Sequence, residues 1–277
     1  MDSNEISRII HGAHEKMAPH YGDLDLDGQV PMNSLPHWNY QRHVLRPLSS
    51  AVREHLTVRP ATMLDAGCGN GQLFHLFAGL GAAPIYGVDF SETMLRLAVQ
   101  RARINGFPFV PIRGRLEQLD FFKKPRFHLI NLYGVIEHLP RPEKVLRGLE
   151  RLLVPGGILI VAIPRKWSLA WFTYGLFSPR IQDLVMQEGL VDKIRHRRKM
   201  RLYRFYTARE VETLIACRST VRVMARIPIA HGGLLGPFTR VLSRLARSGN
   251  YAALDRWNHR AKTAGLVPAG EYVVFKK

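Results

Sequence analysis

Residues 63–71 have the sequence Met-Leu-Asp-Ala-Gly-Cys-Gly-Asn-Gly, which predicts a buried strand followed by a glycine turn. We expect the strand at 61–65 and a helix that begins near Gln72. Glycines 67, 69 and 71 lack a Cβ atom, so the turn can adopt positive φ angles and a ligand can approach its backbone. Their spacing is Gly-x-Gly-x-Gly, whereas a dinucleotide-binding turn has Gly-x-Gly-x-x-Gly, so the pyrophosphate fingerprint is not matched.

An acidic residue ends the next apolar run. Residues 85–89 read Ile-Tyr-Gly-Val-Asp and predict a second strand. Asp89 lies about 20 residues after the glycines, the interval at which a carboxylate meets ribose hydroxyls in nucleotide-binding folds. One carboxylate can accept hydrogen bonds from both the 2′- and the 3′-hydroxyl. Alternatively, Asp89 serves only as a helix cap in an ordinary strand-helix-strand unit.

Strands and helices are predicted to alternate along the chain. Ser91 is a natural N-cap for a helix, and Pro142 suits the first turn of another. The strands are expected at 61–65, 85–89, 109–113, 127–132, 158–163, 220–227 and 271–275, and the helices at 72–79, 91–104, 142–154 and 208–217. Such alternation predicts a parallel α/β sheet wound on both faces, with ligands at the carboxyl ends of its strands.

Four motifs in register carry a family resemblance. They are Asp-Ala-Gly-Cys-Gly-Asn-Gly at 65–71, Val-Asp-Phe-Ser at 88–91, Val-Ile-Glu-His-Leu-Pro at 135–140 and Pro-Gly-Gly at 155–157. Together they resemble the class I S-adenosylmethionine-dependent methyltransferases. The resemblance implies a Rossmann-like seven-stranded sheet whose last strand is antiparallel. It also implies an N-terminal helical cap at 1–50 and a cofactor-binding domain at 51–277 with a lid or insert at about 165–204.

The resemblance implies S-adenosylmethionine as cofactor and a set of residues that hold it. These residues are Asp65, Gly67, Gly69, Gly71, Asp89, Phe90, Arg115, Leu116, Tyr133 and Arg42. Many family members have Asp at the position of Arg115, where it accepts from the adenine amino group. Arginine has no acceptor, so that bond is either lost or supplied by a backbone carbonyl. Arg42 either pairs with the methionyl carboxylate of the cofactor or is a surface arginine.

The sequence after the fourth predicted strand limits the classes of molecule that could accept the methyl group. Base-methylating enzymes carry Asn-Pro-Pro-Tyr or a near relative there, whereas residues 131–134 are Asn-Leu-Tyr-Gly. Over roughly residues 35–215 the chain resembles the ubiquinone-biosynthesis O-methyltransferases and related small-molecule methyltransferases. Those enzymes are associated with a divalent metal and carry a Glu where this chain has Gly134. Because one oxygen ligand is lost, we predict no required metal.

Glu137 and His138 are the candidate catalytic residues. Methyl transfer to a hydroxyl requires proximity, desolvation and a base, and an imidazole can take the proton near neutral pH. His138 is the first candidate base, although in this motif a histidine often only packs beneath the cofactor. Glu137 is the second candidate, with a structural or cofactor-side role as the alternative. We therefore expect O-methylation of a hydrophobic small molecule that is quinone-, lipid- or natural-product-like.

Charge and composition predict the partners. The chain has 277 residues, 46% of them hydrophobic, and 40 basic against 22 acidic residues give a net charge of +18. An aromatic run at 167–177 precedes a basic cluster at 193–204, which predicts a lid, an anionic membrane contact or an acidic carrier protein as partner. The two cysteines, the N-terminal sequence and the lack of a spanning apolar run predict a cytoplasmic protein, peripheral on the inner membrane face if anchored. The alternatives are an RNA methyltransferase, with nucleic acid as partner, and a non-catalytic scaffold that keeps the fold.

Overall fold

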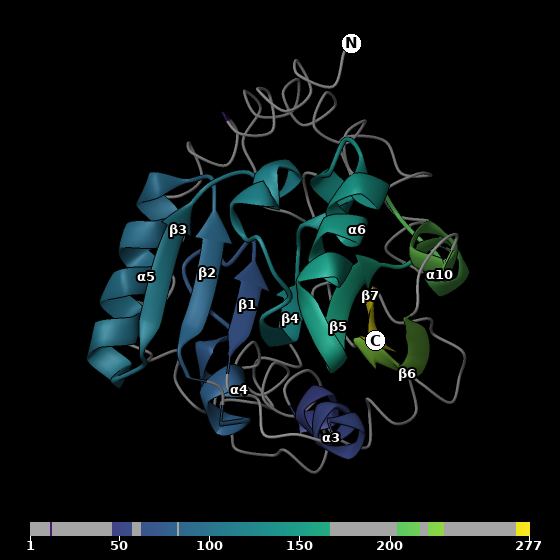
Figure 1. Cartoon of the computed structure of the whole chain (residues 1–277), viewed down its shortest axis with the longest axis horizontal. Coiled ribbons are helices and arrows are strands. Elements are labelled where there is room, and N and C mark those ends of the chain that lie inside the picture. The colour runs from purple at the N-terminus through teal and green to yellow at the C-terminus, as the bar shows by residue number, and fades with distance from the viewer. Residues whose placement is uncertain are drawn as a thin grey trace, which may run out of the picture.

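The computed structural model describes residues 12, 46–56, 62–81, 83–166, 204–216, 221–229 and 270–277. Their strands form one seven-stranded sheet in the order β3-β2-β1-β4-β5-β7-β6 (Figure 1). The strands are β1 (Met63–Ala66), β2 (Ile85–Asp89), β3 (Phe109–Arg113), β4 (Phe127–Leu132), β5 (Leu153–Pro164), β6 (Arg222–Ile229) and β7 (Gly270–Lys276). This order confirms the predicted Rossmann-like sheet.

The direction of the strands follows the prediction as well. β1 to β5 pair in parallel, and β7 runs antiparallel between β5 and β6. Since the strands of the parallel part end at the same edge, the segments that follow β1, β2, β3 and β4 converge there. The strands β2, β3 and β4 have the expected bounds.

The fifth strand begins earlier than predicted. Leu153 is already paired with Phe127 of β4, so α6 (Pro142–Leu152) ends two residues before the expected 154. The Pro-Gly-Gly segment therefore lies inside the strand as an irregularity and not in front of it. Gly156 has a φ of 79°, and its amide donates to the carbonyl of Lys277 at 2.8 Å, which ties this bend to the end of the chain.

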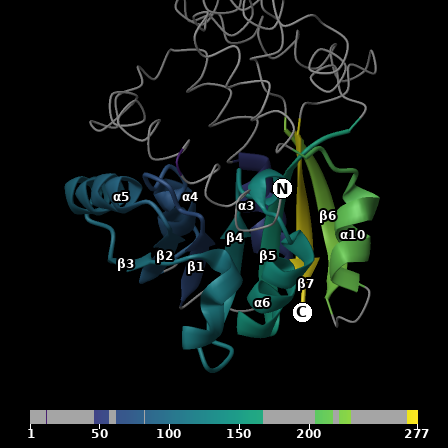
Figure 2. The ribbon, with the colours of Figure 1, turned by 90° about the horizontal axis from the view of Figure 1, so that it is seen from above.

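Two hydrophobic layers cover the sheet. On one face lie α3 (Arg46–His55), α4 (Phe74–Gly79) and α5 (Glu92–Asn105), and on the other lies α6 (Figure 2). Phe74 and Phe77 of α4 are fully buried in the first layer, and Leu146 and Leu149 of α6 in the second. α10 (Ala208–Ala216) and the 3₁₀ helix η2 (Leu116–Phe121) join the second layer, as does the short 3₁₀ helix η3 (Ile136–His138).

The capping signals predicted from the sequence are seen in α5 and α6. The Ser91 hydroxyl accepts from the Met94 amide at 3.2 Å, and Gly106 ends α5 with a left-handed φ of 68°. Pro142 occupies the first turn of α6. These local signals place both helices so that each returns the chain to the start of the next strand.

Several sequence predictions fall outside the described residues. They are the helical cap before residue 46 with Arg42, the aromatic run 167–177, the basic cluster apart from Arg204, and Cys217. The predicted boundary at residue 50 lies within α3, which packs against β6 and β7. Among the helices that the structure describes, none is long and apolar enough to cross a membrane.

Candidate active site

A cavity of about 260 Å³ opens at the edge of the sheet where β1, β2, β3 and β4 end. It is lined by the glycine turn after β1, the start of α5, the segment after β3 and the segment between β4 and α6. Nine of the residues predicted from the sequence line it: Asp65, Gly67, Gly69, Asp89, Phe90, Arg115, Leu116, Tyr133 and His138. The cavity thus joins residues that are far apart in the chain, as the parallel topology requires.

The three glycines of the turn have left-handed φ angles of 76°, 52° and 78°, at Gly67, Gly69 and Gly71. A Cβ atom on Gly67 would overlap the side chain of Val135, and one on Gly71 would overlap the ring of Phe74. A Cβ on Gly69 would meet no atom within 4 Å. Packing therefore excludes a side chain at Gly67 and Gly71, but not at Gly69. Gly67 and Gly69 line the cavity, whereas Gly71 does not.

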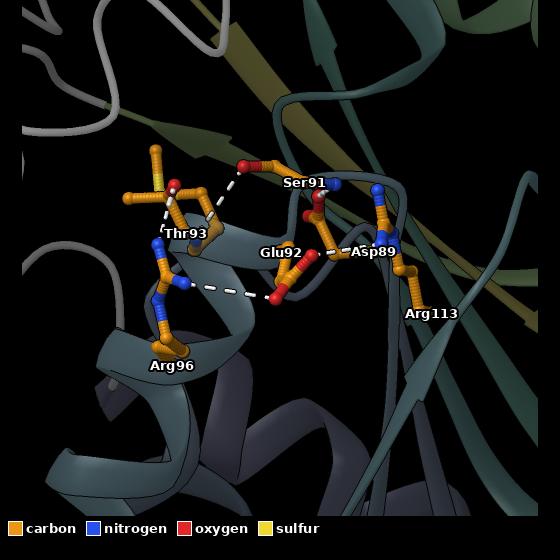
Figure 3. A network of polar contacts seen from close by, with 7 residues as sticks. Asp89, Ser91, Glu92, Thr93, Arg96 and Arg113 are labelled. Carbon is orange, nitrogen blue, oxygen red and sulfur yellow. Dashed lines mark hydrogen bonds and ion pairs between the residues drawn. The ribbon is translucent and has the colours of Figure 1, made fainter.

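Asp89 is held rigidly at the end of β2. Its Oδ2 accepts from the Gly69 amide at 2.9 Å. Its Oδ1 accepts from the Ser91 amide, also at 2.9 Å (Figure 3). A carboxylate has about four lone-pair sites, so it can accept from hydroxyl donors in addition to two backbone amides. The side chain of Arg113 extends the same region outward through an exposed ion pair with Glu92 at 2.8 Å.

A second carboxylate, Asp65, lies at the floor of the cavity and is only 2% exposed. Asn131 of β4 donates to its Oδ1 at 2.7 Å. Burial raises the pKa of Asp65 to about 7; the Asn131 hydrogen bond opposes this shift, and the nearby Asp89 adds to it. Asp65 is therefore close to its titration point at neutral pH, where a cationic ligand would favour the ionised form.

Some side chains of the segment after β4 line the cavity, and others are buried in the core. Tyr133 and His138 line the cavity. Glu137 does not line it: the side chain is buried, and its Oε2 has no hydrogen-bond partner among the described residues. Burial raises the pKa of Glu137 to about 7. Of the two catalytic candidates, only His138 is thus placed to meet a molecule in the cavity.

The segment after β3 forms the remaining wall. Arg115 is exposed, Leu116 is buried, and Glu117 adds a third carboxylate to the lining. The carbonyl of Arg115 accepts from the Gln118 amide at 3.0 Å, which starts η2. Sequence reasoning missed Glu117 as a lining residue, although it stands two positions after Arg115.

Asn131 was also missed as a residue of the site. The available signal was a polar side chain within the otherwise mostly apolar run Phe-His-Leu-Ile-Asn-Leu of β4. Because parallel strands place register partners side by side, Asn131 faces Asp65 of β1 across the sheet. A buried polar side chain needs a hydrogen-bond partner, and here the partner is the carboxylate of Asp65 at the floor of the cavity.

Among the described residues, no group of three or more His, Cys, Asp and Glu side chains is placed to hold a metal ion. Gly134, at the position where the ubiquinone enzymes were expected to carry a Glu, has a φ of 66° and open space around it. Three further histidines of the sequence, His11, His14 and His20, lie outside the described residues, so the absence of a required metal stays a prediction.

A family model described as "Methyltransferase domain" matches residues 59–200, a little over half of the chain. Ubiquinone biosynthesis O-methyltransferase from Glaesserella parasuis is 29% identical over 135 residues, which are 47% of this chain and 57% of that protein. The enzyme of the same name from Neisseria meningitidis is 29% identical over 126 residues, 45% of this chain and 53% of that protein. The chain therefore spans about half the length of the curated relatives it matches.

Solved structures agree in fold. The 1,6-didemethyltoxoflavin-N1-methyltransferase of Burkholderia thailandensis, solved with 1,6-didemethyltoxoflavin and S-adenosylhomocysteine, has a TM-score of 0.59 at 15% identity, covering 100% of this chain and 91% of its own. The plantazolicin methyltransferase BamL, solved with a triazolic desmethylPZN analog and S-adenosylhomocysteine, has a TM-score of 0.57 at 15% identity, covering 99% of this chain and 97% of its own. At these identities the likeness concerns the fold alone.

Proposed function

The chain belongs to the methyltransferase domain family, and on this premise we propose that it transfers a methyl group from S-adenosylmethionine to a hydroxyl of a hydrophobic small molecule. S-adenosylmethionine is the cofactor that this family and its solved relatives indicate. The observation that carries the proposal is one cavity at the strand ends that contains the open turn at Gly69, the fixed carboxylate of Asp89 and the imidazole of His138. The distant O-methyltransferase relatives support oxygen as the methyl acceptor.

The residues of the cavity fit the parts of the cofactor. The Asp89 carboxylate would accept from the ribose hydroxyls, and the wall from Arg115 to Glu117 would contact the adenine, with Met94 packing opposite it. S-adenosylmethionine supplies an electrophilic methyl group on a sulfonium. Gly69 has no side chain, and the space that a Cβ atom would occupy there is open. The sulfonium methyl group could therefore come close to the backbone of the turn.

The chemistry left to the protein is orientation, exclusion of water and removal of one proton. His138 lines the cavity and is half-buried, so its imidazole would accept the hydroxyl proton. The methyl group would pass from sulfur to the acceptor oxygen, and S-adenosylhomocysteine would be the leaving group. Tyr133 lines the cavity and stacks on Tyr272, with ring centroids 5.9 Å apart, so its ring would form an apolar wall beside the reacting oxygen. An apolar wall excludes water from the reacting pair and favours a hydrophobic acceptor.

An anionic partner is supported by the exposed side of α6. Lys144, Arg147 and Arg151 follow at three- and four-residue spacing and so share one side of the helix, with Lys123 and Lys124 near its end. Like charges at this spacing cost stability on an isolated helix. Arg151 also pairs with Asp120 at 3.4 Å, and a bound anionic surface would relieve the repulsion that remains. We propose an anionic membrane or an acidic carrier protein as this partner, and RNA as the competing candidate, whose binding would fall steeply with salt.

The experiment that tests the proposal is calorimetric titration of the full chain with S-adenosylmethionine and S-adenosylhomocysteine. It is followed by transfer of a radiolabelled methyl group to a panel of catechols, hydroxylated quinone precursors, amines and RNA. Micromolar binding with label transferred only to hydroxyl acceptors would support the proposal. Label on RNA would favour the RNA methyltransferase, and binding of neither cofactor form would favour the scaffold.

A further inference from the structure

Asn131 is a fully buried polar residue in the middle of the sheet, with 0% of its surface exposed. Its side-chain amide donates to Oδ1 of Asp65 at 2.7 Å. The two residues are direct register partners on the parallel neighbours β4 and β1, so the sheet itself holds their side chains on the same face. Asp65 lines the cavity and Asn131 does not, which places the amide directly behind the carboxylate.

The pair is unfavourable for folding by itself. Oδ1 of Asn131 has no hydrogen-bond partner among the described residues, and the Asp65 carboxylate is almost fully removed from water. A buried polar atom without a partner and a buried charge both oppose folding, whereas an apolar residue at either position would not. Such a pair in a core strand is therefore better explained by a ligand than by stability.

The ligand group can be identified by elimination among the carboxylates of the cavity. Three carboxylates line it: Asp65, Asp89 and Glu117. Asp89 accepts a backbone amide on each oxygen and faces the ribose in the proposed function. Glu117 lies on the wall after β3, next to Arg115. Asp65 remains as the carboxylate at the floor, and the cofactor's hydrogen-bonding cation is its α-ammonium group.

We propose that Asn131 is a positioning residue of the cofactor site: its amide holds the Asp65 carboxylate in place to receive the α-ammonium group of S-adenosylmethionine. This inference rests on the proposed function and adds to it a residue that does not touch the cavity. A neutral Asp65 would attract the ammonium group weakly. Because burial already favours the neutral form, loss of the Asn131 donor would move Asp65 further toward it.

The test compares two ligands that differ in the amino-acid part. S-adenosylhomocysteine carries the ammonium group, and 5′-deoxy-5′-methylthioadenosine carries only the adenosine and a methylthio group. Both are titrated calorimetrically against the full chain and its variants Asn131→Leu and Asn131→Asp, from pH 6.5 to 8.5. Ile130→Val, a change in the neighbouring core residue of β4, is the matched control, because Ile130 packs in the core away from the cavity.

Asn131→Leu should weaken S-adenosylhomocysteine binding at least about tenfold and leave methylthioadenosine within about twofold, since only the ammonium contact is affected. Asn131→Asp should stay within about threefold of the unaltered chain, because one proton shared by two adjacent carboxyls lets residue 131 donate as the amide does. Ile130→Val should change neither affinity by more than about twofold, since one methylene is removed.

Three results would overturn the inference. In Asn131→Leu, these are an equal loss of affinity for both ligands or no loss of affinity for either. The third is a loss of affinity in Asn131→Asp as large as in Asn131→Leu. Thermal unfolding of each variant shows whether it folds. If Asn131→Leu does not fold, the inference is tested by ligand binding to the isosteric Asn131→Asp variant and by the pH dependence of ligand affinity in the unaltered chain. S-adenosylhomocysteine should then gain affinity relative to methylthioadenosine as pH rises through about 7, and a flat ratio overturns the inference. If the unaltered chain binds neither ligand, the proposed function itself fails.

Discussion

The backbone amide of Gly69 donates to Oδ2 of Asp89 at 2.9 Å, which joins the glycine turn after β1 to the end of β2 across 20 residues of sequence. The other carboxylate oxygen accepts from the Ser91 amide, so Asp89 connects the turn to the N-terminus of α5. One side chain thus shapes the cavity before any ligand arrives and also presents a carboxylate to it.

Asp89→Ala should weaken S-adenosylmethionine binding by well over tenfold, because hydrogen bonds to a charged group contribute about 1.5–3 kcal/mol. Isothermal titration of both proteins measures the change. Asp89→Asn serves as the control: it keeps one acceptor oxygen and should retain more affinity than the alanine variant. Unchanged affinity in Asp89→Ala would mean that the ribose lies elsewhere.

His138→Asn should lower kcat by a factor of about 10²–10⁴, the usual contribution of a general base, and leave cofactor affinity almost unchanged. Asparagine keeps a polar side chain of similar reach at the cavity wall but cannot take the proton. Steady-state kinetics with a hydroxyl acceptor, together with cofactor titration, separate the two effects. A matched Glu137→Gln variant should retain most of its turnover, since Glu137 does not line the cavity. A kcat that survives the loss of His138 would assign the histidine a packing role.

The unliganded chain should lose stability as pH rises from about 5 to 8. Burial raises the pKa of Asp65 and of Glu137 to about 7, well above the ordinary range of a carboxyl group. The folded state therefore binds more protons than the unfolded state in this window, so the free energy of unfolding falls with rising pH. Thermal melts across the window measure the slope. Glu137→Gln removes one of the two titrating groups and should make the slope shallower, while an unchanged slope would mean that Glu137 titrates normally.

Two glycines of the same turn should respond differently to alanine. Gly67→Ala should destabilise the fold strongly, because the new methyl group overlaps Val135 and the left-handed φ of 76° costs about 1–2 kcal/mol more. Gly69→Ala meets no neighbouring atom, so its melting temperature should fall less. The affinity of the Gly69→Ala variant for S-adenosylmethionine should fall, however, because the added methyl group would occupy open space at a turn that lines the cavity. Melting temperature and cofactor titration of both variants make the comparison.

The double variant Gly67→Ala, Val135→Ala isolates the packing part of this effect. Removing the Val135 methyl groups takes away the atoms that the new Cβ would overlap, so part of the lost stability should return. The strain of the positive φ remains, and recovery should be incomplete. Full additivity of the two single changes would show that Val135 is not what excludes a side chain at Gly67.

Local patterns predicted much of this molecule. β2, β3 and β4 have their predicted bounds because each is a short apolar run between polar or turn residues, and Ser91 caps α5 because its side chain precedes a helical stretch. The start of β5 was missed because Leu153 continues the apolar stripe of α6 in sequence. In the structure it pairs with Phe127 instead, a contact with a residue 26 positions away that periodicity does not register.

For the site, the sequence by itself determined the glycine turn, Asp89 and the family, because backbone conformation and residue spacing are local properties. Only the tertiary structure decided which side of each motif faces the cavity. Glu137 and His138 are adjacent in the chain, yet Glu137 is buried and His138 lines the cavity, since a 3₁₀ turn points successive side chains in different directions. Asn131 and Asp65 meet although 66 residues separate them, because two parallel strands bring register partners together. Burial, which sets the ionisation of Asp65, exists only in the folded chain.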